Sequence, residues 1–253
     1  MSEVILYRWP AAARFGRVVP KTKFYERGGV SASARDLFVT EVQRITWAYK
    51  LADATIHLRG SDEVPEIQVF VIDAKGDEVS DTVLAAIDRS VPFPIVFEVT
   101  RAAGAQAETR MVAAYKRLDG KTPRLAPYVS TPWAPSGCAR QPLPTALDLA
   151  GLYAALLGPL LPLDPLPGER LAEMTVRLEQ ARKLERQIVA LERRMGSEPQ
   201  LNRKIELRRQ VRALSVELAE LTAPAPLTAP EPLTAPAPLT AEPALGKGTP
   251  WTS

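Results

Sequence analysis

Two amphipathic runs near the end of this sequence, separated by a short break, constrain its fold more than any other feature. Apolar residues recur at three- and four-residue steps in both, as they do along the buried stripe of a helix. They are Leu171, Met174, Leu178, Ala181, Leu184, Ile188, Leu191 and Met195 in the first run, and Leu207, Val211, Leu214, Leu218 and Leu221 in the second. Between the runs, Gly196 suits the C′ position of one helix and Ser197 the N-cap of the next. Two helices joined by so short a turn must fold antiparallel, so residues 164–221 are predicted to form a helical hairpin.

The sequence after these runs repeats the pattern Leu-Thr-Ala-Pro-Ala-Pro, with proline at every second or third position. Proline lacks a backbone donor and fixes φ, so this spacing excludes both helix and sheet interior. Residues 222–253 are therefore predicted to be a disordered, extended Pro/Ala-rich tail.

Residues 1–163 alternate strand-like and helix-like segments, which predicts a mixed-sheet α/β head and an α+β class for the whole chain. Residues 67–72 are apolar at nearly every position and are expected to form a strand buried on both faces. A helix capped by Ser80 follows it. Next come two strands, at 95–99 and 111–115, which we expect to form a hairpin.

Two further segments of the head have patterns that predict regular structure. A helix is expected to begin after Ser31 or Ser33, because apolar residues then recur at helical spacing. These are Leu37, Phe38, Val42, Ile45 and Tyr49. Residues 55–58 are expected to form a short strand that contains His57.

The composition limits the chemistry that the chain can perform. It contains one histidine, His57, and one cysteine, Cys138, so a zinc cluster cannot be built from imidazole and thiolate, and no Ser-His-Asp elbow motif is present. No resident cofactor is expected. A single cysteine, no readable signal peptide and no unbroken apolar stretch of about 20 residues predict a cytoplasmic protein that does not enter a membrane. The formal charge of +3, from 32 basic and 29 acidic residues, does not by itself predict a nucleic-acid partner.

One pattern suggests a Mg²⁺-dependent nuclease of the restriction-endonuclease-like type. Asp73-Ala74-Lys75 ends the buried strand and resembles an acid-x-Lys triplet, in which carboxylates hold Mg²⁺ and lysine stabilises charge on the attacked phosphate. Glu41 on the preceding helix, with Glu63 or Glu66 at the strand start, could supply the other carboxylates. A charged strand end that enters a turn explains the same residues. Glu98 and Lys116, on the two strands of the hairpin, are expected to form a cross-strand ion pair.

Two basic segments are candidate nucleic-acid surfaces. The first interleaves cations with aromatic residues and comprises Lys21, Lys23, Phe24 and Tyr25. The second lies on the second hairpin helix and comprises Arg203, Lys204, Arg208 and Arg209. A solvated helix face explains the second cluster as well.

The hairpin is also a candidate docking element. A lone pair of helices buries only one stripe of each, so such hairpins bind partner helices or dimerise into four-helix bundles. Packing of the hairpin back onto the head is the alternative.

Five segments carry a family resemblance. They are Val-Pro-Lys-Thr-Lys-Phe-Tyr-Glu at 19–26, Ile-Thr-Trp-Ala-Tyr-Lys-Leu at 45–51, Val-Pro-Glu-Ile-Gln-Val-Phe at 64–70, Pro-Phe-Pro-Ile-Val-Phe-Glu at 92–98 and Arg-Gln-Pro-Leu-Pro at 140–144. In this order they resemble a bacterial family, domain of unknown function 4391, over roughly residues 1 to 221. Members are often encoded beside DNA methyltransferases and helicases of restriction or phage-defence type, which implies an accessory subunit and identifies no catalytic residue.

Two hypotheses follow. The first is a non-catalytic accessory protein of a DNA-modification, restriction or phage-defence assembly, whose hairpin docks a protein such as a methyltransferase or helicase, or a second copy of the chain, and which also contacts DNA. The alternative is the nuclease, with Mg²⁺ held by Glu66 and Asp73 beside Lys75.

Overall fold

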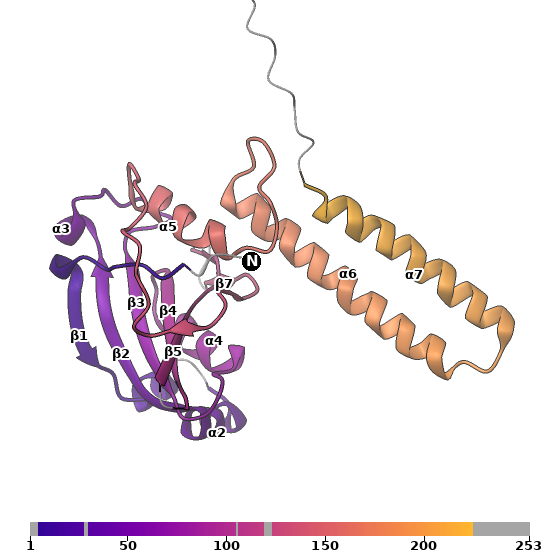
Figure 1. Cartoon of the computed structure of the whole chain (residues 1–253), viewed down its shortest axis with the longest axis horizontal. Helices are drawn as coiled ribbons and strands as arrows, with labels where there is room; N and C mark the ends of the chain where they lie inside the picture. Colours follow the sequence, from indigo (N-terminus) through magenta and orange to yellow (C-terminus); the bar gives the residue numbers. More distant parts are fainter. Residues whose placement is uncertain (1–4, 28–29, 105, 119–122, 225–253) are drawn as a thin grey trace, which may run out of the picture.

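The computed structural model describes residues 5–27, 30–104, 106–118 and 123–224. A mixed β-sheet with helices on both of its faces forms the head, and two long helices project from it as an arm (Figure 1). These are α6 (Leu171–Ser197) and α7 (Leu201–Thr222), which pack against each other and run antiparallel. The predicted class, a mixed-sheet head followed by a helical hairpin, is confirmed. The predicted tail lies, from residue 225 on, outside the described residues.

The sheet follows the order of the chain. Within the described residues it has seven strands: β1 (Arg14–Val18), β2 (Val42–Leu51), β3 (Ile67–Ala74), β4 (Ile95–Ala103), β5 (Gln106–Ala113) and β8 (Val129–Ser130) in that order, with β9 (Ala134–Pro135) also paired to β5. Neighbouring strands are antiparallel except β3 and β4, and α4 (Asp81–Ser90) supplies the crossover that this parallel pair requires. A separate ribbon pairs β6 (Lys116–Arg117) with β7 (Arg124–Leu125).

The prediction that the helix after Ser31 continues to Tyr49 is wrong. Ser31 does cap α2 (Ala32–Glu41) by accepting a hydrogen bond from the Ala34 amide at 3.2 Å, but the helix ends where β2 begins. Two register shifts in β2, typical of β-bulges, interrupt its two-residue alternation. The buried positions of this strand therefore recur every three residues, at Val42, Ile45, Ala48 and Leu51, and imitate a helix.

The prediction of a strand at residues 55–58 is also wrong. One helical turn, α3 (Asp53–Ile56), occupies this segment, and it ends at His57 in the left-handed conformation with φ of +57°. Thr55 favours the turn because its hydroxyl donates to the Lys50 carbonyl at 2.8 Å and accepts from the Ala52 amide at 2.9 Å.

Each face of the sheet carries its own apolar core. The face covered by α1 (Thr22–Arg27), α2 and α4 buries Phe70 and Ile72 of β3, while Ile67 and Val69 of the same strand lie in the opposite core. Burial of β3 on both faces, predicted from its apolar run, is confirmed.

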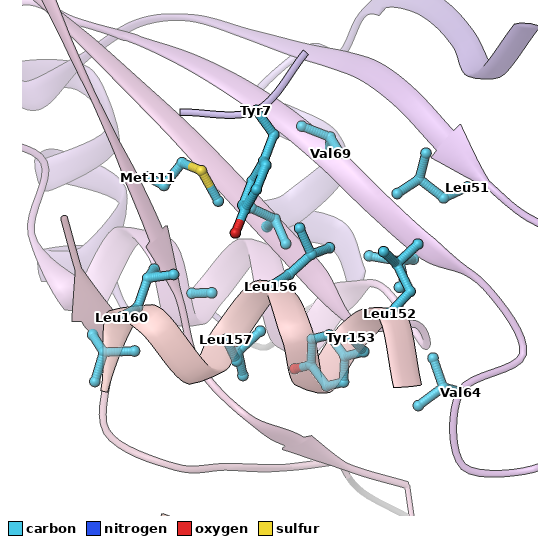
Figure 2. Packing of buried hydrophobic residues seen from close by; sticks show 14 of the residues in the cluster. Tyr7, Leu51, Val64, Val69, Met111, Leu152, Tyr153, Leu156, Leu157 and Leu160 are labelled. Atoms are coloured by element: carbon cyan, nitrogen blue, oxygen red, sulfur yellow. The ribbon is translucent and has the colours of Figure 1, made fainter. Parts of the chain in front are cut away.

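The opposite core joins the head to the arm. Figure 2 shows the side of α5 (Leu149–Leu157) that carries Leu152 and Leu156 facing the sheet, near Tyr7 of the N-terminal segment. Met174 and Leu178, in the first turns of α6, belong to the same cluster. The base of the arm is therefore part of the head's core.

A buried ion pair lies between α4 and the β6–β7 ribbon. The Lys116 ammonium pairs with the Asp88 carboxylate, and both side chains are fully buried. It also donates to the carbonyls of Asp88 (2.6 Å), Val91 (2.9 Å) and Phe93 (2.7 Å), while the Tyr128 hydroxyl donates to Asp88 at 2.9 Å. Burial lowers the pKa of Lys116 and raises that of Asp88, each opposed by the charge of its partner.

The predicted pair between Glu98 and Lys116 is therefore wrong. Glu98 lies opposite Met111 on β5, whereas Lys116 lies beyond the end of that strand. Glu98 instead forms two hydrogen bonds with the Arg140 guanidinium, at 2.7 and 3.0 Å, and accepts a third from the Trp9 indole at 2.6 Å.

The arm is held at its base by Arg177. Its guanidinium forms hydrogen bonds with the Glu169 carboxylate at 2.8 Å, and donates to the carbonyls of Asp164 (2.7 Å) and Leu221 (2.9 Å), which ties the end of α7 to the start of α6. Hydrogen bonds from Arg177 lower the pKa of Glu169. This contact closes the hairpin at the end nearest the head.

The turn between the arm helices differs from its predicted caps. Gly196 and Ser197 are the last residues of α6, and the Ser197 hydroxyl donates back to the Arg194 carbonyl at 3.1 Å. The Gln200 amide donates to the Glu198 carboxylate at 3.0 Å, and Gln200 precedes α7 without a side-chain cap.

Replacing Lys116 with Met should destabilise the head by about 3–5 kcal/mol, because the Asp88 charge and three carbonyls would remain buried without their partner. Urea unfolding followed by circular dichroism measures the change. Lys183→Met, at an exposed position of α6, is the control and should shift stability by no more than about 0.5 kcal/mol. A loss under about 1 kcal/mol for Lys116→Met would contradict the buried pair.

Replacing Leu207 with Asp should unfold the outer part of the arm, because Leu207 is buried at 8% exposure between the helices. The cost should be about 3 kcal/mol, as for a charge placed in an apolar contact. Helical circular dichroism and limited proteolysis detect the loss. Val216→Asp on the same helix is the matched control: Val216 is 54% exposed, so this variant should retain its helicity.

Candidate interaction surfaces

The residues of the nuclease hypothesis each have a different partner. Glu66 forms an ion pair with Lys50 at 2.6 Å. Asp73 forms one with Arg44 at 2.7 Å, and the Lys75 ammonium donates to the Val39 carbonyl at 2.6 Å.

The structure does not bring Glu66, Asp73 and Lys75 together. Glu66 precedes β3 and Asp73 lies near its other end, so seven steps of extended chain, about 23 Å, separate them. Strand alternation also directs these two positions to opposite faces of the sheet. In the part of the chain that the structure describes, no group of three His, Cys, Asp or Glu side chains could hold a metal ion. The geometry thus builds no Mg²⁺ site from the predicted residues.

The basic segment near the N-terminus folds with its aromatic residues inward. Phe24 is buried against Phe38, with ring centroids 6.2 Å apart, and Tyr25 contacts the same ring edge-on at 5.3 Å. The Lys21 ammonium donates to the Val42 carbonyl at 2.5 Å, and burial, together with the nearby charge of Lys75, lowers its pKa. Lys23 remains exposed at the surface. Phe24 and Tyr25 therefore pack into or against the core, and Lys23 is the exposed residue of this basic segment's four candidates.

The second basic cluster lies on the outer half of the arm. Arg203, Arg208 and Arg209 are exposed and Lys204 is half-buried. Residues 201–212 contain five basic residues and one acid, Glu206, whereas residues 213–222 contain two acids and no base. These basic residues lie near the N-terminus of α7, which is the positive end of the helix dipole, where acidic residues stabilise a helix. The first turn of α7 contains no acidic residue. The position of this cluster is therefore not explained by helix stability.

The seam between α6 and α7 is unevenly covered: α7 buries Leu207 in its outer half, and its Leu214, Leu218 and Leu221 nearer the head are half-buried. Four apolar residues in the first half of α6 are buried: Met174, Leu178, Ala181 and Leu184. Farther out, Ile188, Leu191 and Met195 are only half-buried. Five more apolar side chains on the arm are substantially exposed, namely Val176 (40%), Val189 (46%), Leu201 (71%), Ile205 (43%) and Val216 (54%). The arm thus presents apolar surface along its length that its two helices do not cover.

A groove of about 850 Å³ lies where the head meets the arm. It runs between α4, the segment around Tyr128 and α6, and α6 is tied to this segment by the Arg182 guanidinium, which donates to the Tyr128 carbonyl at 3.0 Å. Its charged lining mixes signs, with Asp81 and Glu179 beside Lys183. The groove has no single charge preference that would select a ligand.

Sequence reasoning missed the network around Glu98. Glu98 ends one segment of the family resemblance and Arg140 begins another, and the fold brings them into contact through two hydrogen bonds. Arg140 also donates to the Tyr7 carbonyl at 2.9 Å. Glu98 and Arg140 are each the charged residue of their segment, and this sequence feature could have suggested an ion pair. The spacing of the two segments, however, does not show that they meet in the fold.

None of the helices within the described ranges is long and apolar enough to cross a membrane.

No curated protein and no solved structure matches the chain. A family model, Domain of unknown function (DUF4391), matches residues 8–218. The match spans the head and nearly all of the arm, so this chain belongs to the DUF4391 family.

Proposed function

We propose that this chain is a non-catalytic interaction subunit whose arm docks a partner protein. The observation that carries the proposal is the apolar surface that the arm leaves exposed near its tip. Val189, Leu201 and Ile205 are 46%, 71% and 43% exposed, on a helix pair whose base packs into the head through Met174 and Leu178. Exposed apolar surface on a projecting, well-formed element is typical of a binding site.

The arm suits helix recognition. Two packed helices leave a groove along their seam, and a third amphipathic helix can lay its apolar side into it. Ile205 and Val216 extend the apolar surface along α7. A partner helix would thereby complete a three-helix bundle over the outer arm.

The charge of the arm defines the partner further. The outer half of α7 carries Arg203, Lys204, Arg208 and Arg209 against the single acid Glu206. Arg193 and Arg194 at the end of α6 add to this positive tip. A partner helix with acidic residues flanking its apolar stripe complements this surface, and complementary charge raises both specificity and association rate. A methyltransferase or helicase of a DNA-modification or phage-defence assembly is the class of partner that we propose.

Site-specific photocrosslinking tests the docking. A benzophenone amino acid at Ile205 should crosslink one defined protein in cells of the native host, and the crosslinked peptide should be helical and acidic. Charge reversal of Arg208 and Arg209 to Glu should reduce the adduct by about tenfold, because it replaces attraction with repulsion.

The matched control places the same crosslinker at Leu147, which is 97% exposed on the head. It should give no adduct with that protein. An adduct of the chain with itself at Ile205 would replace the proposed partner with a second copy. Equal, diffuse crosslinking from both positions would contradict docking by the arm.

DNA contact is a second candidate function, favoured by the exposed bases of the outer arm. Replacing Arg203, Arg208 and Arg209 with Ala should lower the slope of log affinity against log salt by about 0.9 for each phosphate that the variant no longer neutralises. Fluorescence anisotropy with a labelled duplex at several salt concentrations measures this slope.

The same measurement on Lys21→Ala separates the two basic clusters. Because the Lys21 ammonium is engaged by the Val42 carbonyl, this variant should keep the parent slope. If only Lys21→Ala changes the slope, the DNA surface lies on the head. If the duplex does not bind the parent chain at low salt, the chain does not contact DNA through either cluster.

A further inference from the structure

Five aromatic side chains form a row across one face of the sheet. Phe15 on β1 contacts Trp47 on β2 with ring centroids 4.0 Å apart, and the row continues through Phe70 on β3 (6.1 Å), Phe97 on β4 (6.4 Å) and Tyr128 (6.3 Å). Trp47 pairs with Phe70, and Phe70 with Phe97, in the strand registers, so the rings are fixed side by side.

A cavity of about 420 Å³ opens onto this row. Trp47 and Phe70 line it from the sheet, Phe24 and Lys23 from α1, and Phe93 from the loop after α4, with Gln68 at the start of β3. A mostly apolar and aromatic lining with a few polar groups is the usual composition of a small-molecule site, and the volume lies in the usual range. Eight of the ten lining residues fall in four of the segments that carry the family resemblance.

The polar groups of this cavity favour an anion. Lys23 is its one basic residue, and none of the ten lining residues is acidic. At the outer end of the row, the Arg17 guanidinium lies over the Phe15 ring, 4.9 Å from its centroid, and is exposed. Lys23 is therefore the cation at the cavity itself, whereas Arg17 lies outside its lining, beside Phe15.

The indole nitrogen of Trp47 is a second, independent observation. It is buried, and it has no hydrogen-bond partner among the described residues. A buried donor without an acceptor costs free energy, and most such groups in proteins are paired. Because Trp47 lines the cavity, a molecule that binds there and displaces the atoms now covering the indole nitrogen would supply the acceptor.

We propose that this cavity binds a nucleotide unit, with the base against the half-buried rings of Trp47 and Phe93 and the phosphate near Lys23. Every nucleobase has a flat π-face and ring or carbonyl acceptors, so it fits both the aromatic wall and the unpaired indole donor. Two sources share this chemistry: a free nucleotide and one nucleotide of a single strand. The proposal is independent of docking by the arm, which lies on other residues.

Isothermal titration of the full chain with AMP, adenosine and ribose 5-phosphate tests the proposal. AMP should bind saturably, adenosine more weakly, and ribose 5-phosphate not at all, because it lacks the base. A dT8 oligonucleotide distinguishes the sources: much tighter binding than AMP indicates a single strand, and equal or weaker binding indicates a free nucleotide.

Two variants localise the binding. Trp47→Phe keeps an aromatic ring but removes the donor, and should weaken AMP binding about fivefold. Lys23→Gln should weaken AMP binding about fivefold but leave adenosine unchanged, because the lysine acts on the phosphate. Lys183→Gln on α6 is the matched control and should leave all affinities unchanged.

Absence of saturable binding by AMP and by dT8 at millimolar concentration would overturn the proposal. So would nucleotide binding that neither Trp47→Phe nor Lys23→Gln weakens, since the nucleotide would then bind elsewhere. Circular dichroism of both variants must match that of the parent chain. If it does not, Phe93→Ala replaces them, because it keeps the backbone carbonyl that accepts from Lys116. This variant should weaken AMP binding by about fivefold or more.

Discussion

The arrangement of the head depends on the interactions of the buried Lys116 ammonium. It neutralises the charge of Asp88 and satisfies three carbonyls at and beyond the C-terminal end of α4, where a cation is also favoured by the helix dipole. The backbone amide of the same residue donates to the Tyr153 hydroxyl of α5 at 3.1 Å, and that hydroxyl donates to the Ala114 carbonyl at 2.8 Å. One residue thus ties the helices on both faces of the sheet to the end of β5. Because an unpaired charge in this position would be costly, the loop from α4 to β4 has few alternatives.

This constraint reaches the aromatic cavity. The carbonyl of Phe93 accepts from Lys116 while its side chain lines the cavity, so the ion pair fixes one wall of the proposed nucleotide site. Tyr128, which donates to Asp88, also ends the aromatic row. The polar network thus meets the cavity at Phe93 and the row at Tyr128, and a shift in the network displaces both.

Local patterns predicted the arm and much of the sheet. The hairpin followed from apolar spacing and a short turn, and β3 from its unbroken apolar run, because these features depend on neighbours in sequence. β2 was misread because its two register shifts turn a two-residue period into one of three. The partners of Glu98 and Lys116 could not be predicted at all: Arg140 is 42 residues from Glu98, and Asp88 is 28 from Lys116. For the same reason the cavity, which gathers residues from four segments, has no signal in any one of them. Lys23 and Phe24 were predicted to belong to one nucleic-acid surface; Lys23 is exposed, Phe24 is buried, and both line the cavity.

The arm has a gradient of stability that bears on how it binds. Its base is held by Arg177 and by the packing of Met174 and Leu178 into the head, whereas beyond Leu184 the two helices support only each other, with Leu207 buried between them. Isolated helix pairs with one shared stripe are marginal, and local unfolding concentrates where buried contacts are few. The unfavourable bases at the start of α7 lower the stability of the tip further. A partner that covers the seam and neutralises these bases would stabilise the tip as it binds, so part of its interaction energy would be spent on ordering the arm. Affinity would then respond to substitutions that change only the helicity of the tip, even where the substituted residue does not touch the partner.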